Sequence, residues 1–64
     1  MRSELIAARG IKTQGEVAKI IGISQKYLSK LELEQRNPSI TIAYKLAKYY
    51  KKPIEELFPD IFIK

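Results

Sequence analysis

Apolar side chains recur at every third or fourth position along most of the chain, with breaks at Gly10, Gly22, Asn37-Pro38 and Lys52-Pro53. This spacing is typical of helices that bury one face, and glycine or proline commonly marks where such helices stop. The pattern therefore predicts short helices over residues 2–9, 13–21, 39–51 and 53–58, and another that begins at Ser24. No strand pattern occurs before residue 60.

The inward positions of these helices form the predicted core. They are Met1, Leu5, Ala8, Val17, Ala18, Ile21, Leu28, Leu31, Ile40, Ala43, Leu46, Ala47 and Tyr50. The expected fold is all-α, a compact five-helix domain over residues 1–64 with a short apolar tail at 59–64 that is extended or strand-like. A domain of 64 residues buries only about 60% of its unfolded surface, so a partner would add stability.

Residues 13–32 meet the steric demands of two helices joined by a tight turn. Thr13 and Ser24 are good N-caps for the two helices. Ala18 is small where the helices must cross, and Gly22 can end the first helix in the left-handed conformation at little steric cost. Ile23 can then fill the corner between them. The segment is therefore predicted to be a helix-turn-helix.

The outer face of the helix that begins at Ser24 is rich in hydrogen-bond donors. With Leu28 and Leu31 inward, a rotation of about 100° per residue points Lys26, Ser29 and Lys30 away from the core. Gln25 and Tyr27 lie on the two flanks. Lysine, glutamine and serine can each bond base edges in a DNA groove. The alternative is a plain helical bundle in which this face is only solvated.

Composition narrows the function further. Twelve lysine and arginine residues against seven acidic ones give a net charge of +5, which favours a polyanionic partner. Cysteine and histidine are absent, and no paired carboxylates or glycine-rich phosphate loop occurs, so we expect neither an enzyme nor a metal or other cofactor. No apolar run is long enough to span a bilayer, so a cytoplasmic location without a membrane or small-molecule ligand is expected.

The segment from Gln14 to Glu32 resembles the phage-repressor/Cro (Xre) helix-turn-helix family. The likeness continues through Arg36-Asn37-Pro38-Ser39, Leu46-Ala47-Lys48 and Ile54 to Phe58. It implies a sequence-specific regulator of transcription that binds double-stranded DNA, as a dimeric repressor or autoregulator on a near-palindromic operator. An antitoxin or adaptor that uses the same fold for protein binding is the alternative.

The resemblance also implies roles for individual residues. Gln25, Lys26 and Lys30 would contact bases, with Ser29 in reach, Tyr27 on a phosphate and Ser24 at the start of the helix. Thr13 and Gln14 would hold a phosphate at the start of the preceding helix. Arg36 and Asn37 would contact the DNA backbone, or would serve only to organise the turn before Pro38.

The chain departs from the family pattern at two places. Leu33-Glu34 stands where the family has a small polar residue and then glycine, so either Glu34 is left-handed or the helix continues. Ile6 stands where the family has an arginine that pairs with the glutamate matched by Glu32. Either Arg9 or Arg2 substitutes for that arginine, or backbone donors hold Glu32.

The tail carries three consecutive large apolar residues, which rarely remain free in water. It could fold back over the first and fifth helices, or it could form a dimer interface or an added edge strand. We favour a homodimer whose interface involves Phe58, Ile61, Phe62 and Ile63, because helix-turn-helix regulators commonly read two half-sites.

Overall fold

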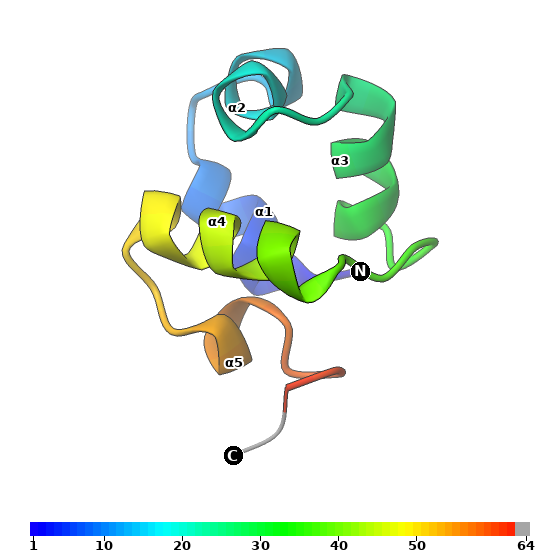
Figure 1. Ribbon diagram of the computed structural model, residues 1–64, viewed down its shortest axis with the longest axis vertical. Helices are drawn as coiled ribbons and strands as arrows, with labels where there is room; N and C mark the ends of the chain where they lie inside the picture. The colour runs from blue at the N-terminus through cyan, green and yellow to red at the C-terminus, as the bar shows by residue number, and fades with distance from the viewer. Residues whose placement is uncertain (63–64) are drawn as a thin grey trace.

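The structure is a computed structural model that describes residues 1–62, and it consists of short helices joined by turns (Figure 1). The helices are α1 (Ser3–Arg9), α2 (Gln14–Ile21), α3 (Gln25–Glu32), α4 (Ile40–Tyr50) and α5 (Ile54–Leu57). Each helix corresponds to one that the apolar pattern predicts, and residues 1–62 contain no strand. The all-α prediction is therefore confirmed for this part of the chain.

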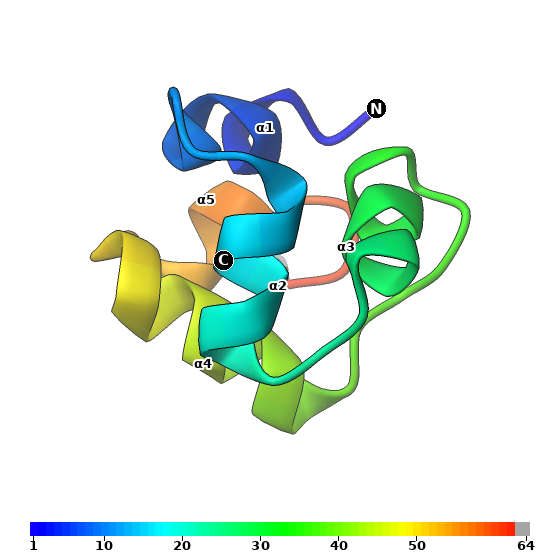
Figure 2. The same cartoon turned by 90° about the horizontal axis from the view of Figure 1, so that it is seen from above.

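The helices surround a single core. α2 packs chiefly against α3, α4 packs against α5, and α1 contacts both α3 and α5. Seen from above, α1 and α4 lie on opposite sides of α2 (Figure 2). α3 therefore stands at one edge of the molecule with one face toward the core and the other toward solvent.

Ten apolar residues are buried, and most of them are among the predicted core positions. The set is Leu5, Val17, Ala18, Ile21, Leu28, Leu31, Ala43, Leu46, Leu57 and Phe58. The predictions for Met1 and Ile40 are wrong, since they are 73% and 59% exposed. Met1 precedes α1 and Arg2 is buried instead, while the register of α4 turns Ile42 and Ala43 toward the core.

Side chains cap the two helices of the motif as predicted. The hydroxyl of Thr13 accepts a hydrogen bond from the Glu16 amide at 3.1 Å, and the Thr13 amide donates to the Glu16 carboxylate at 2.9 Å. This is a complete capping box. At the next helix, the Ser24 hydroxyl accepts from the Tyr27 amide at 3.0 Å. Each cap satisfies an amide at the start of a helix that would otherwise have no partner in the helix.

The turn between α2 and α3 is built on Gly22. Its φ of +91° is in the left-handed region, which glycine adopts without steric cost. The amides of Gly22 and Ile23 both donate to the carbonyl of Ala18, at 2.8 and 2.9 Å. Ile23 is then half-buried against the core, and Ala18 is 2% exposed. The corner is therefore closed in the manner that the sequence predicts.

α3 ends at Glu32, and the turn that follows it contains a non-glycine residue with a positive φ. Glu34 has a φ of +64°, so the left-handed alternative is correct and the helix does not continue. The Gln35 amide donates to the Lys30 carbonyl at 2.9 Å, which closes the last turn. A non-glycine residue in this conformation costs about 1–2 kcal/mol.

The first part of the tail folds back on its own chain. Phe58 is fully buried, so its predicted place in a dimer interface is wrong: the core of the monomer already covers its side chain. Ile61 and Phe62 are half-buried against the same core. The rings of Phe62 and Phe58 pack edge to face, with their centroids 6.3 Å apart. Residues 59–62 form a turn rather than the extended or strand-like segment that we predicted. Ile63 lies outside the described residues.

None of the helices in residues 1–62 is long and apolar enough to cross a membrane.

Candidate nucleic-acid interface

The face of α3 that points to solvent carries the predicted polar side chains. Leu28 and Leu31 are fully buried on its inner face. Gln25 and Lys26 are exposed, and Ser29 and Lys30 are half-exposed. The division into a core-facing edge and a donor-rich edge therefore agrees with the sequence prediction.

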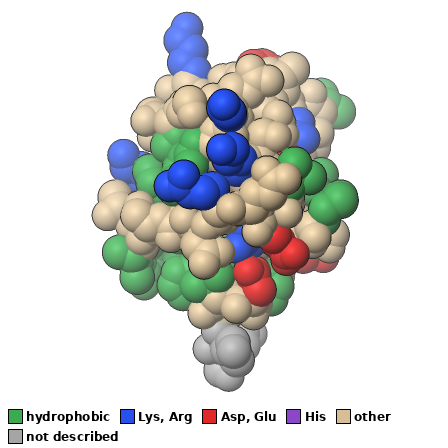
Figure 3. All heavy atoms as spheres, turned by 90° about the vertical axis from the view of Figure 1, so that its right-hand side faces the viewer, with side chains coloured by type: hydrophobic (Ala, Val, Ile, Leu, Met, Phe, Trp, Pro, Cys, Tyr) green, Lys and Arg blue, Asp and Glu red, His purple; other side chains and the backbone are tan. Residues whose placement is uncertain are grey.

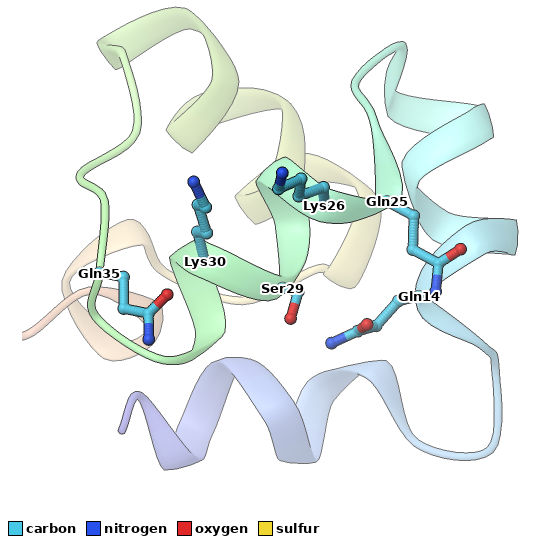
Figure 4. Close-up of a pocket in the computed structure, with 6 residues that line it drawn as sticks. All are labelled: Gln14, Gln25, Lys26, Ser29, Lys30 and Gln35. Atoms are coloured by element: carbon cyan, nitrogen blue, oxygen red, sulfur yellow. The ribbon is translucent and has the colours of Figure 1, made fainter.

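These side chains line an open groove of about 530 Å³ between the start of α2, the outer face of α3 and the loop that follows α3 (Figure 4). Its lining consists of Gln14, Gln25, Lys26, Ser29, Lys30 and Gln35. Amide, hydroxyl and ammonium groups can all donate hydrogen bonds, and the lining contains no carboxylate. The groove is therefore suited to a ligand that presents many acceptor atoms.

Gly15 gives Gln25 room beside α2. A Cβ atom at Gly15 would lie 3.4 Å from the side-chain oxygen of Gln25, at the tight limit of ordinary contact. The amide of Gln25 thus lies across the N-terminal turn of α2, next to Gln14 (Figure 4). The structure brings these two predicted site residues together although they belong to different helices.

Gln14 has a structural role besides the predicted one. Its side-chain nitrogen donates to Glu32 at 2.8 Å, and Arg9 donates to the same carboxylate at 2.8 and 3.3 Å. The Glu32 side chain is only 3% exposed. Arg9 is therefore the arginine that substitutes for the one missing at Ile6, and Gln14 is held in a fixed position at the edge of the groove.

The start of α2 offers fewer free donors than the sequence suggests. The capping box occupies the amides of Thr13 and Glu16, and it holds the pKa of the Glu16 carboxyl below its ordinary value through hydrogen bonds from Thr13. The ionised carboxylate of Glu16 also neutralises part of the positive end of the helix. Gln14 and Gly15 are thus the positions at which backbone amides of this turn can meet a phosphate.

The loop after α3 is held by side chains from elsewhere. Arg36 is exposed and its guanidinium lies 5.7 Å from the centre of the Tyr27 ring. Tyr27 is half-buried, so its ring gives the Arg36 guanidinium a fixed surface for a cation–π contact. Asn37 accepts a hydrogen bond from Arg2 at 2.9 Å. This contact agrees with the structural role that was the alternative for Asn37.

Positive charge gathers on this side of the molecule. Figure 3 looks at the side on which α3 lies, and lysine and arginine side chains cluster near its centre with acidic ones lower down. Within residues 1–62, Lys26, Lys30 and Arg36 form no ion pair, whereas Arg2, Arg9 and Lys52 each pair with a carboxylate. The cations around the groove are therefore among those that remain available to an anionic ligand.

Gln35 is a lining residue that the sequence reasoning missed. It comes three residues after the end of α3 at Glu32, and the turn at Glu34 directs the chain back toward Lys30. The only sequence signal is an amide side chain soon after the recognition segment. That signal depends on knowing the conformation of Glu34, which the sequence left open.

The chain is similar to known proteins along most of its length. Residues 5–57 match the helix-turn-helix family. The chain is 41% identical over 46 residues to an uncharacterized HTH-type transcriptional regulator of Archaeoglobus fulgidus, and 39% identical over 46 residues to a second one. A regulator of the same description from Methanocaldococcus jannaschii is 35% identical over 46 residues. No solved structure gives a significant match.

The matched segments are 72% of this chain, and they cover 66%, 65% and 70% of the three relatives in that order. The chain thus spans about two thirds of the length of these relatives. The family match includes both α2 and α3 and the turn at Gly22 between them. The chain therefore belongs to the helix-turn-helix family, in agreement with its resemblance to phage-repressor/Cro (Xre) sequences.

Proposed function

We propose that the chain binds double-stranded DNA in a sequence-specific manner and regulates transcription, with α3 in the major groove. The observation that carries this proposal is the groove along α3, which joins hydrogen-bond donors to cations that have no acidic partner within residues 1–62. The major groove of DNA admits an α-helix and presents acceptor atoms on guanine and adenine. The names of the relatives, HTH-type transcriptional regulators, support the regulatory role.

In this proposal, the outer face of α3 reads the bases. Lys26 and Lys30 donate to guanine O6 and N7, and Gln25 bonds adenine through both ends of its amide. Ser29 lies in the same groove and can bond several bases. The groove geometry supports these roles because all of the four side chains line one continuous space.

Other residues position the duplex without reading it. Gln14 and the first turn of α2 receive one phosphate, with Thr13 and Ser24 at the helix starts close to the backbone. Arg36 receives another phosphate, supported by Tyr27. Asn37 contributes mainly by holding the loop in place.

A homodimer is part of the proposal. Two copies would read half-sites about 34 Å apart in a near-palindromic operator. Because Phe58 is buried, the interface would rest on the exposed parts of Ile61 and Phe62 and on the chain beyond them. Sedimentation equilibrium at micromolar concentration tests this part, and a strict monomer in the presence and absence of operator DNA would contradict it.

Selection of bound sequences from a pool of random duplexes tests the main proposal. We expect an enriched inverted repeat, and a salt titration should separate it from a scrambled site of the same length. Specific sites typically bind about 10³-fold or more tighter than nonspecific DNA. Weak binding that is indifferent to sequence would instead favour the adaptor or antitoxin function.

A further inference from the structure

Arg2 is the most completely bonded side chain in the described part of the chain. Its side chain is 1% exposed, and each of the five N–H groups of its guanidinium has an acceptor. One terminal nitrogen donates to the carbonyls of Leu31 and Arg36, and the other to Asn37 and Asp60. Its Nε donates to the second oxygen of Asp60 at 3.1 Å. A guanidinium bonded in this way has no freedom to reorient.

These acceptors come from three separate parts of the fold. Leu31 belongs to the last turn of α3, Arg36 and Asn37 belong to the loop that follows it, and Asp60 belongs to the tail. The start of the loop is also held by the amides of Gln35 and Arg36, which donate to the Lys30 carbonyl, and by an exposed ion pair between Glu34 and the N-terminal ammonium. The later part, at Arg36 and Asn37, is held by Arg2. Arg2 therefore fixes the path of the loop relative to α3, and it does so from the N-terminal end of the chain.

Within residues 1–62, Asp60 is the one acidic partner of this buried cation. The two form a bidentate pair, with the shorter contact at 2.8 Å. A buried charge is costly unless an opposite charge and hydrogen bonds compensate for it, so removing the carboxylate leaves Arg2 without its counter-charge. The guanidinium would then be drawn toward water, and its bonds to the loop would weaken. The tail and the loop are thus connected through a single side chain.

We propose that Arg2 is a positioning residue for DNA binding, with Asp60 as its counter-charge, and that this pair links the tail to the placement of Arg36 on a DNA phosphate. The inference rests on the proposed function. Arg36 is held at three points: its carbonyl accepts from Arg2 at 3.0 Å, its amide donates to the Lys30 carbonyl at 3.3 Å, and its guanidinium lies over Tyr27. When the bond from Arg2 is lost, the backbone of Arg36 keeps the longer bond to Lys30, and its side chain starts from a less fixed position. A partner copy that engages the tail and displaces Asp60 would therefore change DNA affinity.

The test is Asp60→Asn, compared with Glu56→Gln as a matched control. Both changes remove one partly exposed carboxylate near the C-terminal end, but Glu56 pairs with Lys52 and does not contact the loop. Binding to the selected duplex is measured at several salt concentrations. We expect Asp60→Asn to raise Kd by roughly tenfold and to reduce the slope of log K against log salt by about 0.9, the value for one phosphate contact. Glu56→Gln should leave the slope unchanged.

The slope separates positioning from a general loss of folded protein, because fewer folded molecules would lower the active fraction without changing the number of phosphate contacts. Arg36→Ala should reduce the slope of log K against log salt by the same amount as Asp60→Asn. The double variant, Arg36→Ala with Asp60→Asn, should reduce the slope no further than either single change. Asp60→Glu keeps the counter-charge and should recover at least part of the slope even if Asp60→Asn folds poorly.

Amide hydrogen exchange of the free protein gives a readout that does not depend on DNA. The amides of Gln35 and Arg36, which both donate to the Lys30 carbonyl, should exchange faster in Asp60→Asn than in Glu56→Gln. Unchanged exchange, or an unchanged slope with folded Asp60→Asn, would overturn the inference while leaving the proposed function intact. If the unaltered protein selects no duplex, the proposed function fails instead.

Discussion

The Nε of Arg9 donates to Glu32 across 2.8 Å and so ties the last turn of α1 to the last turn of α3. Gln14 at the start of α2 donates to the same carboxylate. The contact with Glu32 holds the pKa of the Arg9 guanidinium above its ordinary value. One nearly buried glutamate therefore fixes how α3 lies against two other helices.

Replacement of Glu32 by glutamine should lower the free energy of unfolding. Arg9 would lose its charged acceptor, and hydrogen bonds to charged groups contribute about 1.5–3 kcal/mol each. The control is Glu56→Gln, because its exposed pair with Lys52 should contribute less than about 1 kcal/mol. Urea unfolding of the two variants gives the comparison, and equal losses would argue against the role of Glu32.

Glu34→Gly should stabilise the protein by about 1 kcal/mol. The residue has a φ of +64°, which glycine adopts freely and a residue with a Cβ atom does not. Gln35→Gly is the matched control, because Gln35 is also exposed but has no positive φ, so glycine there should be neutral or destabilising. Thermal unfolding measures both, and a loss of stability in Glu34→Gly would contradict the argument.

Tyr50→Phe should also raise stability, by about 1 kcal/mol. The Tyr50 hydroxyl is buried and has no hydrogen-bond partner within the described residues. An unsatisfied buried hydroxyl is costly, and phenylalanine removes it without a large change in shape. Tyr44→Phe is the control, because Tyr44 is 59% exposed and its hydroxyl can bond water. Chemical denaturation should detect a gain in the first variant and no change in the second.

The same tyrosine predicts a loss of stability at high pH. Burial raises the pKa of Tyr50 to about 12, above its ordinary value of 10.0. A group whose pKa is higher in the folded state contributes its full stability below the unfolded pKa and loses it as the pH rises through the folded pKa. The free energy of unfolding should thus fall between about pH 10 and pH 12, and Tyr50→Phe should reduce that fall. An identical alkaline profile for both proteins would contradict the prediction.

At low pH the free energy of unfolding should change with pH in the opposite direction, and the group responsible is Asp60. The hydrogen bond from Arg2 holds the pKa of Asp60 below its ordinary value of 3.8. A depressed pKa contributes stability above the unfolded value, and this stability is lost as the pH falls through the folded pKa. Unfolding followed from about pH 6 to about pH 2 should show a steeper acid loss in the unaltered protein than in Asp60→Asn. Parallel curves would rule out this contribution.

Alanine at Lys26 or Lys30 should relax the preference for particular base pairs in the selected duplex. Each good base contact contributes about 1–3 kcal/mol of discrimination. Gln14→Ala should instead weaken binding to all sequences alike, because a phosphate contact carries no sequence information. Competition binding with single base-pair variants makes the distinction. If both lysine variants keep the original preference, these residues are not the base readers.

The order of the helices, and their bounds apart from the end of α3, could be predicted from the sequence because they depend on local features. Apolar spacing, the caps at Thr13 and Ser24 and the left-handed turn at Gly22 each involve residues a few positions apart. The same local reasoning predicts the two faces of α3. A helix of known register determines which side chains point outward, whatever its neighbours are.

The tertiary structure decided the contacts between residues that are far apart in the chain. Whether Arg9 or Arg2 serves Glu32 depended on which guanidinium reaches it, and the position of Arg2 depended on Asp60, 58 residues away. Phe58 was an expected interface residue until the packing placed its ring in the core. Such contacts leave no periodic signal in the sequence. By itself, the sequence determined the motif and its outer face, while the folded chain decided how the loop and tail beside that face are held.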